Sequence, residues 1–103
     1  MLRSARMGEG DSELGLRILG TFLRKTGALT DLEALVLYNA GVLLLAPDSP
    51  LIPELTQVEE SGVDVLACGT CIAHYGIQPA LGRVTDMDTI LRELAAAQKV
   101  ITL

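Results

Sequence analysis

Aromatic side chains are scarce in this chain, which has no tryptophan, one phenylalanine and two tyrosines among its 103 residues. Half of the residues are nevertheless hydrophobic, so a core has to be built from leucine, valine, isoleucine and alanine. A chain of this length forms one domain of ordinary size rather than two. We therefore predict a single domain over residues 1–103.

Basic charge is also in short supply. Eight lysine and arginine residues stand against thirteen aspartate and glutamate residues, which gives a formal net charge of -5. A surface of this sign repels phosphate backbones and anionic lipids, and the sequence has no basic cluster that reverses the sign locally. The composition therefore argues against nucleic acid as a partner.

Long hydrophobic runs are missing as well. The longest, residues 40–47, is far shorter than the roughly 18 apolar residues that a membrane span requires. No apolar signal-peptide core follows the basic residues near the N-terminus. We therefore expect a cytoplasmic protein with no membrane partner. Because thiols stay reduced in the cytoplasm, the two cysteines are expected to serve reactivity or metal binding rather than a structural disulfide.

Short strands are predicted at several places. Residues 35–38 and 63–67 are typical of short buried strands, and a terminal strand is expected at 100–103. Only residues 1–6 remain to form a strand ahead of the first glycine-bearing loop. Either that strand is very short or the sequence lacks a piece upstream.

Helical spacing of hydrophobic residues alternates with these runs. This helical spacing begins after Asp11 or Ser12, again after Ser49 and again after Thr85, and each of these side chains can cap a helix. Gly27 is suited to the end of the first helix. Alternating helices and strands predict an α/β fold with a mostly parallel sheet covered on both faces. The side chains expected to face the core are Leu14, Ile18, Leu19, Phe22 and Leu23 in the first helix and Met87, Ile90, Leu91, Leu94 and Ala95 in the last.

The loops that leave the carboxyl ends of parallel strands meet at one edge of the sheet. The predicted elements place four loops there, namely 8–11, 39–41, 68–71 and 85–87, and functional residues are expected among them. Tight turns and helix capping account for the same glycine, asparagine and aspartate residues equally well. The candidate binding residues are Gly8, Gly10, Asp11, Asn39, Gly41, Gly69 and Thr70.

The first of these loops resembles the start of a dinucleotide-binding fingerprint. Gly8 and Gly10 have the right spacing, but Glu13 occupies the place of the third glycine. No residue of the chain identifies a cofactor, and none is predicted.

The cysteine pair is the strongest candidate for chemistry. Cys68 ends a predicted strand, and Cys71 lies at the start of the next helical turn. The positive end of a helix favours a thiolate, which is the nucleophilic form, and the spacing lets one cysteine attack while the other resolves the product. We predict Cys68 and Cys71 as the catalytic residues. Inert packing is the second interpretation, since buried cysteines are common.

A metal site is the least favoured interpretation, and none is predicted. A closed zinc site needs four ligands, and the chain offers only His74 beside the two cysteines. His74 follows Cys71 by three residues, so one helical turn brings it back towards the sulfur as a possible base. A surface histidine without a catalytic role is the expectation we favour.

Five short motifs occur in order along nearly the whole chain. They are Met7-Gly-x-Gly-Asp11, Leu14-Gly15, Tyr38-Asn39-x-Gly41-Val42, Cys68-Gly-Thr-Cys71 and Val84-Thr-x-Met87. In this order they resemble the DsrE-like sulfur-relay family, and within it the C-terminal domain of selenium-metabolism proteins of the YedF type. The resemblance implies a three-layer α/β/α fold with a mostly parallel sheet of about five short strands. It also implies assembly into trimers or hexamers.

The resemblance further implies that a cysteine carries sulfur or selenium as a persulfide or its selenium analogue. In sulfur-relay members the carrier cysteine follows a central strand, a place that matches Cys68, and Cys71 is close enough to serve instead. The implied partners are donor and acceptor proteins, with a TusA-type domain as a candidate. Two features depart from the pattern: nothing corresponds to the N-terminal TusA-type domain, and Ala73 stands near the place of an expected acidic residue.

Three functions therefore remain open. The leading hypothesis is a sulfurtransferase-like carrier of sulfur or selenium, the second is a dithiol–disulfide redox module, and the third is a non-catalytic oligomeric interaction domain. The chain has a positive mean hydropathy, and a small domain with this composition is expected to associate with copies of itself. Residues 42–45 and 51–52 are the expected intersubunit surface.

Overall fold

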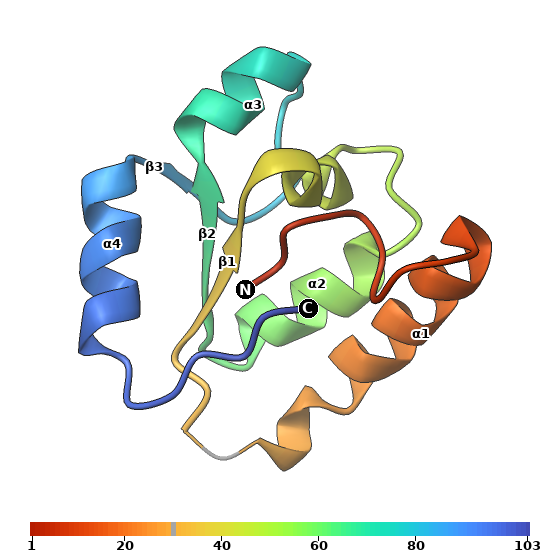
Figure 1. Ribbon diagram of the computed structural model, residues 1–103, viewed down its shortest axis with the longest axis horizontal. Coiled ribbons are helices and arrows are strands. Elements are labelled where there is room, and N and C mark those ends of the chain that lie inside the picture. The colour runs from red at the N-terminus through yellow and green to blue at the C-terminus, as the bar shows by residue number, and fades with distance from the viewer. Residues whose placement is uncertain (30) are drawn as a thin grey trace.

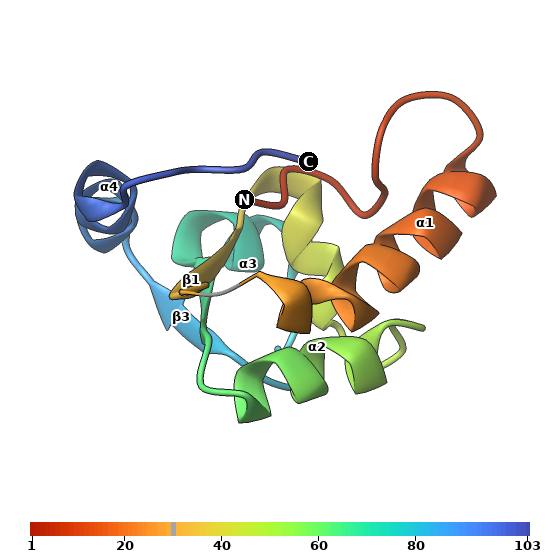
Figure 2. The ribbon, with the colours of Figure 1, turned by 90° about the horizontal axis from the view of Figure 1, so that it is seen from below.

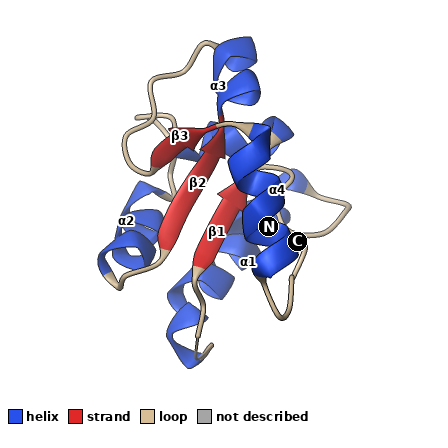
Figure 3. Ribbon diagram, turned by 90° about the vertical axis from the view of Figure 1, so that its left-hand side faces the viewer, coloured by secondary structure: helices blue, strands red, loops and turns tan. Residues whose placement is uncertain are grey.

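The computed structural model describes residues 1–29 and 31–103 and has the mixed α/β architecture that the sequence predicts (Figure 1). The described residues contain a sheet of three strands in the order β1-β2-β3, shown side by side in Figure 3. Both neighbouring pairs are parallel, so the prediction of a parallel sheet is confirmed. The strands are β1 (Ala34–Leu37), β2 (Asp64–Cys68) and β3 (Arg83–Thr85).

Helical segments supply the crossovers that parallel neighbours require. Two of the segments, named η, are 3₁₀ helices, and the others are α-helices. None of the helices in the described part of the chain combines the length and apolar character needed to cross a membrane. In chain order the helical segments are α1 (Ser12–Arg24), η1 (Thr26–Ala28), η2 (Asn39–Leu45), α2 (Ile52–Glu60), α3 (Gly69–Tyr75) and α4 (Met87–Ala96).

Two helices begin at aspartate caps. The Asp11 carboxylate accepts the Leu14 N–H at 2.7 Å, which confirms the predicted start of α1. The Asp86 carboxylate accepts the Thr89 N–H at 2.8 Å at the start of α4. The predicted cap Thr85 instead ends β3, because this residue pairs with the neighbouring strand.

Other predicted helix ends are shifted. Ser49 does not cap α2 directly, because its hydroxyl accepts the N–H of Leu51, which is itself the residue that precedes the helix. Gly27 does not end α1, which stops at Arg24 and is followed by η1. In each case a short turn is inserted between the predicted cap and the helix.

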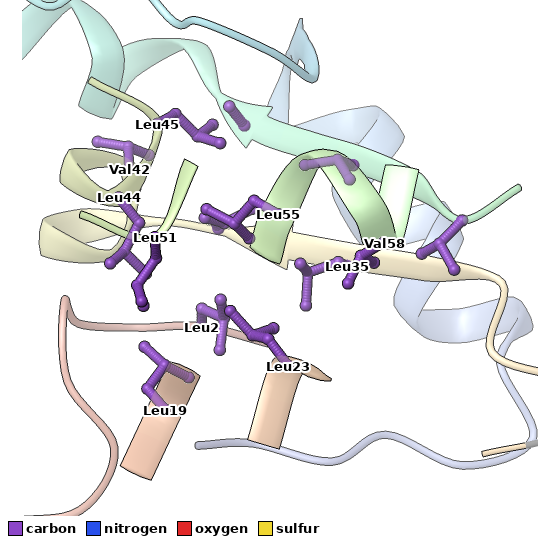
Figure 4. Close-up of a cluster of buried hydrophobic side chains, with 14 residues drawn as sticks. Leu2, Leu19, Leu23, Leu35, Val42, Leu44, Leu45, Leu51, Leu55 and Val58 are labelled. Carbon is purple, nitrogen blue, oxygen red and sulfur yellow. The ribbon is translucent and has the colours of Figure 1, made fainter. Parts of the chain in front are cut away.

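The face of the sheet covered by α1 and α2 holds the larger hydrophobic cluster (Figure 4). Leu19 and Leu23 of α1 pack there against Leu55 and Val58 of α2. On the opposite face a smaller cluster joins α4 to the sheet. Its buried members are Val36, Leu66, Cys68 and Ile90.

The chain termini extend the free edge of β1 without forming further strands. The Leu2 N–H donates to the Val36 carbonyl at 2.7 Å, and Leu2 forms a single parallel bridge with Leu37. The Leu103 N–H donates in turn to the Met1 carbonyl at 3.0 Å. The predicted strand at 100–103 is therefore wrong, and about five strands are not found among the described residues. The three-layer arrangement stays a prediction.

Several apolar side chains face away from the core, contrary to the predicted helix faces. Leu14 is 53% exposed, Met87 58% and Leu91 62%, because the inward faces centre on Leu19 and Ile90 instead. The predicted intersubunit surface is also misplaced. Four of its six residues are buried within the chain, namely Val42, Leu44, Leu45 and Leu51.

Candidate functional site

The site begins where β2 runs directly into α3, as Figure 3 shows. Cys68 is the last residue of β2 and also the residue that precedes α3, with the extended backbone of a helix cap. Gly76 ends α3 in the left-handed conformation, with a φ of 65°. This strand-to-helix transition places Cys71 in the first turn of α3, as predicted.

The two thiols differ in exposure. Cys68 is 3% exposed and belongs to the smaller hydrophobic cluster. Cys71 is half-buried and packs at the margin of both clusters. Both cysteines are free thiols, and Cys71 packs against the cluster in which Cys68 is buried. A reagent in solution therefore has better access to Cys71.

The loop after β1 reaches the same place. The backbone N–H of Asn39, the first residue of η2, donates to the Cys71 Sγ at 3.1 Å. The Tyr75 hydroxyl donates to the Asn39 Oδ1 across 3.5 Å. The predicted meeting of loops 39–41 and 68–71 at one sheet edge is thus confirmed.

The pKa of the Cys71 thiol is raised. Burial is the main cause, and the neighbouring Cys68 thiol acts in the same direction. The Asn39 N–H works against both by stabilising negative charge on the sulfur, which lowers the pKa. The expectation that the helix start leaves this thiol more acidic is wrong for Cys71, because desolvation outweighs the donor. The net effect of this environment is to favour the protonated thiol of Cys71 over its thiolate.

Two candidate glycines have structural reasons to be glycine. A Cβ on Gly41 would collide with the backbone carbonyl of Leu2, and one on Gly69 would lie 3.1 Å from the Thr85 carbonyl oxygen. The contact between Gly69 and Thr85 brings the end of β3 to the site, as predicted for loop 85–87. Thr70 lies exposed between the two cysteines. A ligand-binding role for these residues stays a prediction.

The loop before α1 lies elsewhere. Gly8 and Gly10 have φ values of 76° and 126° and open space around them, while Asp11 caps α1. Figures 1 and 2 both show this loop beside the start of α1 and apart from α3. The predicted convergence of loop 8–11 with the cysteines is therefore wrong. The cause is that the N-terminal segment crosses the end of β1 before it turns into α1.

His74 and Tyr75 complete the exposed end of α3. Their rings meet edge to face with centroids 5.0 Å apart, and both side chains are exposed. Tyr75 was not among the predicted site residues, although it lies one helical turn after Cys71, where helix geometry brings side chains together. Within residues 1–29 and 31–103, no group of three or more histidine, cysteine, aspartate or glutamate side chains is placed to hold a metal ion.

The family model of the DsrE/DsrF-like family matches residues 2–103. The chain belongs to the DsrE/DsrF-like family. The predicted resemblance is confirmed at this level, and sulfur relay is the general activity of the family. The narrower similarity to YedF-type proteins is not confirmed. No curated protein and no solved structure matches the chain.

This DsrE-like chain thus brings a reachable thiol, a buried thiol and a backbone donor into contact. Sulfur chemistry that moves between proteins requires a thiol that a partner can approach. Cys71 meets that requirement in this structure, whereas Cys68 is covered by α4 and the sheet.

Proposed function

We propose that this DsrE-like chain is a sulfurtransferase-like carrier on which Cys71 accepts a sulfane sulfur atom or its selenium analogue. One observation carries the assignment: Cys71 is accessible and hydrogen-bonded by the Asn39 N–H, while its neighbour Cys68 is 3% exposed. Family resemblance by itself favours Cys68. The difference in exposure supports Cys71 as the point of contact with a partner.

The transfer proceeds by thiolate attack. Cys71 loses its proton to solvent and attacks the outer sulfur of a donor protein's persulfide. A new bond forms between the Cys71 Sγ and that sulfur, and the donor's sulfur–sulfur bond breaks. The donor cysteine leaves as a thiolate and takes up a proton, so the exchange involves no net oxidation. Transfer to an acceptor thiol repeats the same step in the opposite sense.

Cys68 is the internal competitor of the carrier. Its thiolate can attack the Cys71 sulfur of the persulfide, which expels the outer atom as sulfide and leaves a Cys68–Cys71 disulfide. The low exposure of Cys68 keeps solvent-borne reagents away from this thiol but leaves its intramolecular reaction with Cys71 open. The dithiol–disulfide module is the second candidate function, because both cysteines are free thiols and Cys71 packs against the cluster that holds Cys68.

Intact mass spectrometry of the reduced chain after incubation with a small persulfide donor separates these functions. The carrier gains about one sulfur atom per chain in a form that dithiothreitol removes. Cys71→Ser abolishes the gain, whereas Cys68→Ser retains it. Loss of about two hydrogens in the parent, absent in both variants, would favour the redox module. An unchanged mass, with thiols that label only after denaturation, would support the interaction domain.

The partners are proposed to be donor and acceptor proteins in the cytoplasm, with a TusA-type domain among the candidates. Self-association into a trimer or hexamer belongs to the same proposal. Its support is the exposed apolar group of Val84, Met87 and Leu91 near β3 and α4. Light scattering at micromolar concentration measures the mass directly, and a monomer would contradict this part of the proposal.

A further inference from the structure

Asn39 is held in an unusual backbone conformation at the site. Its φ is 51°, in the left-handed region that costs a non-glycine residue energy, although asparagine tolerates it better than most. Strained residues of this kind persist where the surrounding structure fixes them, and they cluster at functional sites. The direction in which the N–H points depends on this conformation.

The neighbours of Asn39 are fixed by the N-terminal segment. The Tyr38 N–H donates to the Leu2 carbonyl at 3.0 Å, and the Gly41 N–H donates to the Tyr38 carbonyl at 3.0 Å. Gly41 packs so closely on the Leu2 carbonyl that a Cβ would collide with it. The only hydrogen bond described for the Asn39 N–H is the one to the Cys71 Sγ.

We propose that Asn39 stabilises the reactive anion of Cys71 by aiming its backbone N–H at the sulfur, and that Tyr75 positions Asn39 for this role. The proposal rests on the carrier function assigned to Cys71 above. A hydrogen bond to a thiolate is charge-assisted, so it is stronger for the anion than for the thiol. The Asn39 N–H therefore favours the thiolate, which is the form that attacks the persulfide of the sulfur-donor protein. It also partly offsets the effect of burial, which raises the Cys71 pKa.

The test is the pH dependence of iodoacetamide alkylation in a Cys68→Ser background, where only Cys71 reacts. Asn39→Gly keeps the left-handed conformation and the N–H but loses the side-chain contact with Tyr75, so its profile should match that of Tyr75→Phe. Asn39→Val disfavours that conformation and turns the N–H away. We expect its alkylation at neutral pH to slow about tenfold, with the midpoint moving up by about one unit. Tyr75→Phe should shift the midpoint in the same direction by less.

Equal profiles for the glycine and valine variants would overturn the proposal. If Asn39→Val does not fold, the Asn39 amide proton signal of the otherwise native chain decides the question. The chemical shift of this amide proton should change with pH as Cys71 titrates, and this change should be absent in Cys71→Ser. A chemical shift that does not depend on pH would refute the role of Asn39. Sulfur loading is measured separately by mass. A chain with the expected alkylation profiles but no loading would contradict the carrier function and leave the role of Asn39 intact.

Discussion

On the sheet face covered by α1 and α2, leucine and valine side chains from both helices and the strands form one continuous buried cluster. On the face covered by α4, only Val36, Leu66, Cys68 and Ile90 are buried together. The first face therefore supplies most of the hydrophobic stabilisation, which scales with buried apolar area. The second face is less completely covered and holds Cys68, with Cys71 at the margin between the two clusters. Stability thus comes mainly from one face of the sheet, whereas the cysteine pair lies on the other face and at the margin between the two clusters.

The largest expected effect comes from removing a side chain on the dense face. Leu55 is fully buried, so Leu55→Ala should lower the free energy of unfolding by about 2–5 kcal/mol. Leu91→Ala removes the same atoms from a residue that is 62% exposed and should change it by less than about 0.5 kcal/mol. Urea denaturation measures both. Similar losses of unfolding free energy for the two variants would contradict the difference between the two faces of the sheet. A loss for Leu91→Ala that depends on protein concentration would place that residue in a self-association interface.

A second effect concerns the close approach of the N-terminal segment to η2. The Cβ added by Gly41→Ala would collide with the Leu2 carbonyl, and such overpacking should cost about 1–3 kcal/mol. Gly27→Ala is the matched control, since a Cβ there meets nothing within 4 Å, and it should be neutral or slightly stabilising. Thermal unfolding distinguishes the two. A harmless Gly41→Ala would mean that the Leu2 segment is not held against the loop after β1.

The cap of α1 tests whether the dense face depends on helix ends as well as on packing. Asp11→Ala removes the acceptor of the Leu14 N–H and should cost about 1 kcal/mol in urea denaturation. Asp11→Asn keeps a capping side chain and should lose much less. Equal losses would show that the charge of Asp11, rather than its hydrogen bond, is what matters.

The smallest expected effect is the pH dependence contributed by Cys71. Its pKa is raised in the folded chain, chiefly by burial, so folding favours the protonated thiol. This stabilisation is fully present below the thiol pKa of the unfolded chain and is lost as pH rises through the folded-state pKa. The parent should therefore lose slightly more stability than Cys71→Ser over the alkaline range. Identical pH profiles in urea denaturation would show that burial of this thiol has no energetic consequence.

Local signals in the sequence predicted much of the fold. The expected strands at 35–38 and 63–67 lie within one residue of β1 and β2, and Asp11 caps α1. These signals succeed because runs of buried residues and capping side chains act over a few neighbouring positions. β3 was missed because its three residues, Arg83–Thr85, are mostly exposed and carry no apolar pattern. Its strand conformation depends on pairing with β2.

The site was predicted in part for the same reason. The sequence placed Cys68 at a strand end and Cys71 at a helix start, since strand and helix boundaries are local properties. It placed loop 8–11 at the site as well, because nothing local shows that Leu2 bridges to Leu37 and that the following chain leads away. The sequence likewise did not predict how exposed each cysteine side chain is.

By itself, the sequence determined the α/β class, the acidic surface, the two buried strands, the cysteine pair at the sheet edge and the family, which its ordered motifs indicated. Only the tertiary structure decided which cysteine a partner can approach and which backbone donor meets its sulfur. Those features depend on contacts such as that between Asn39 and Cys71, which lie 32 positions apart in the chain. Such contacts arise from the packing of the whole domain, so no local pattern of residue types specifies them.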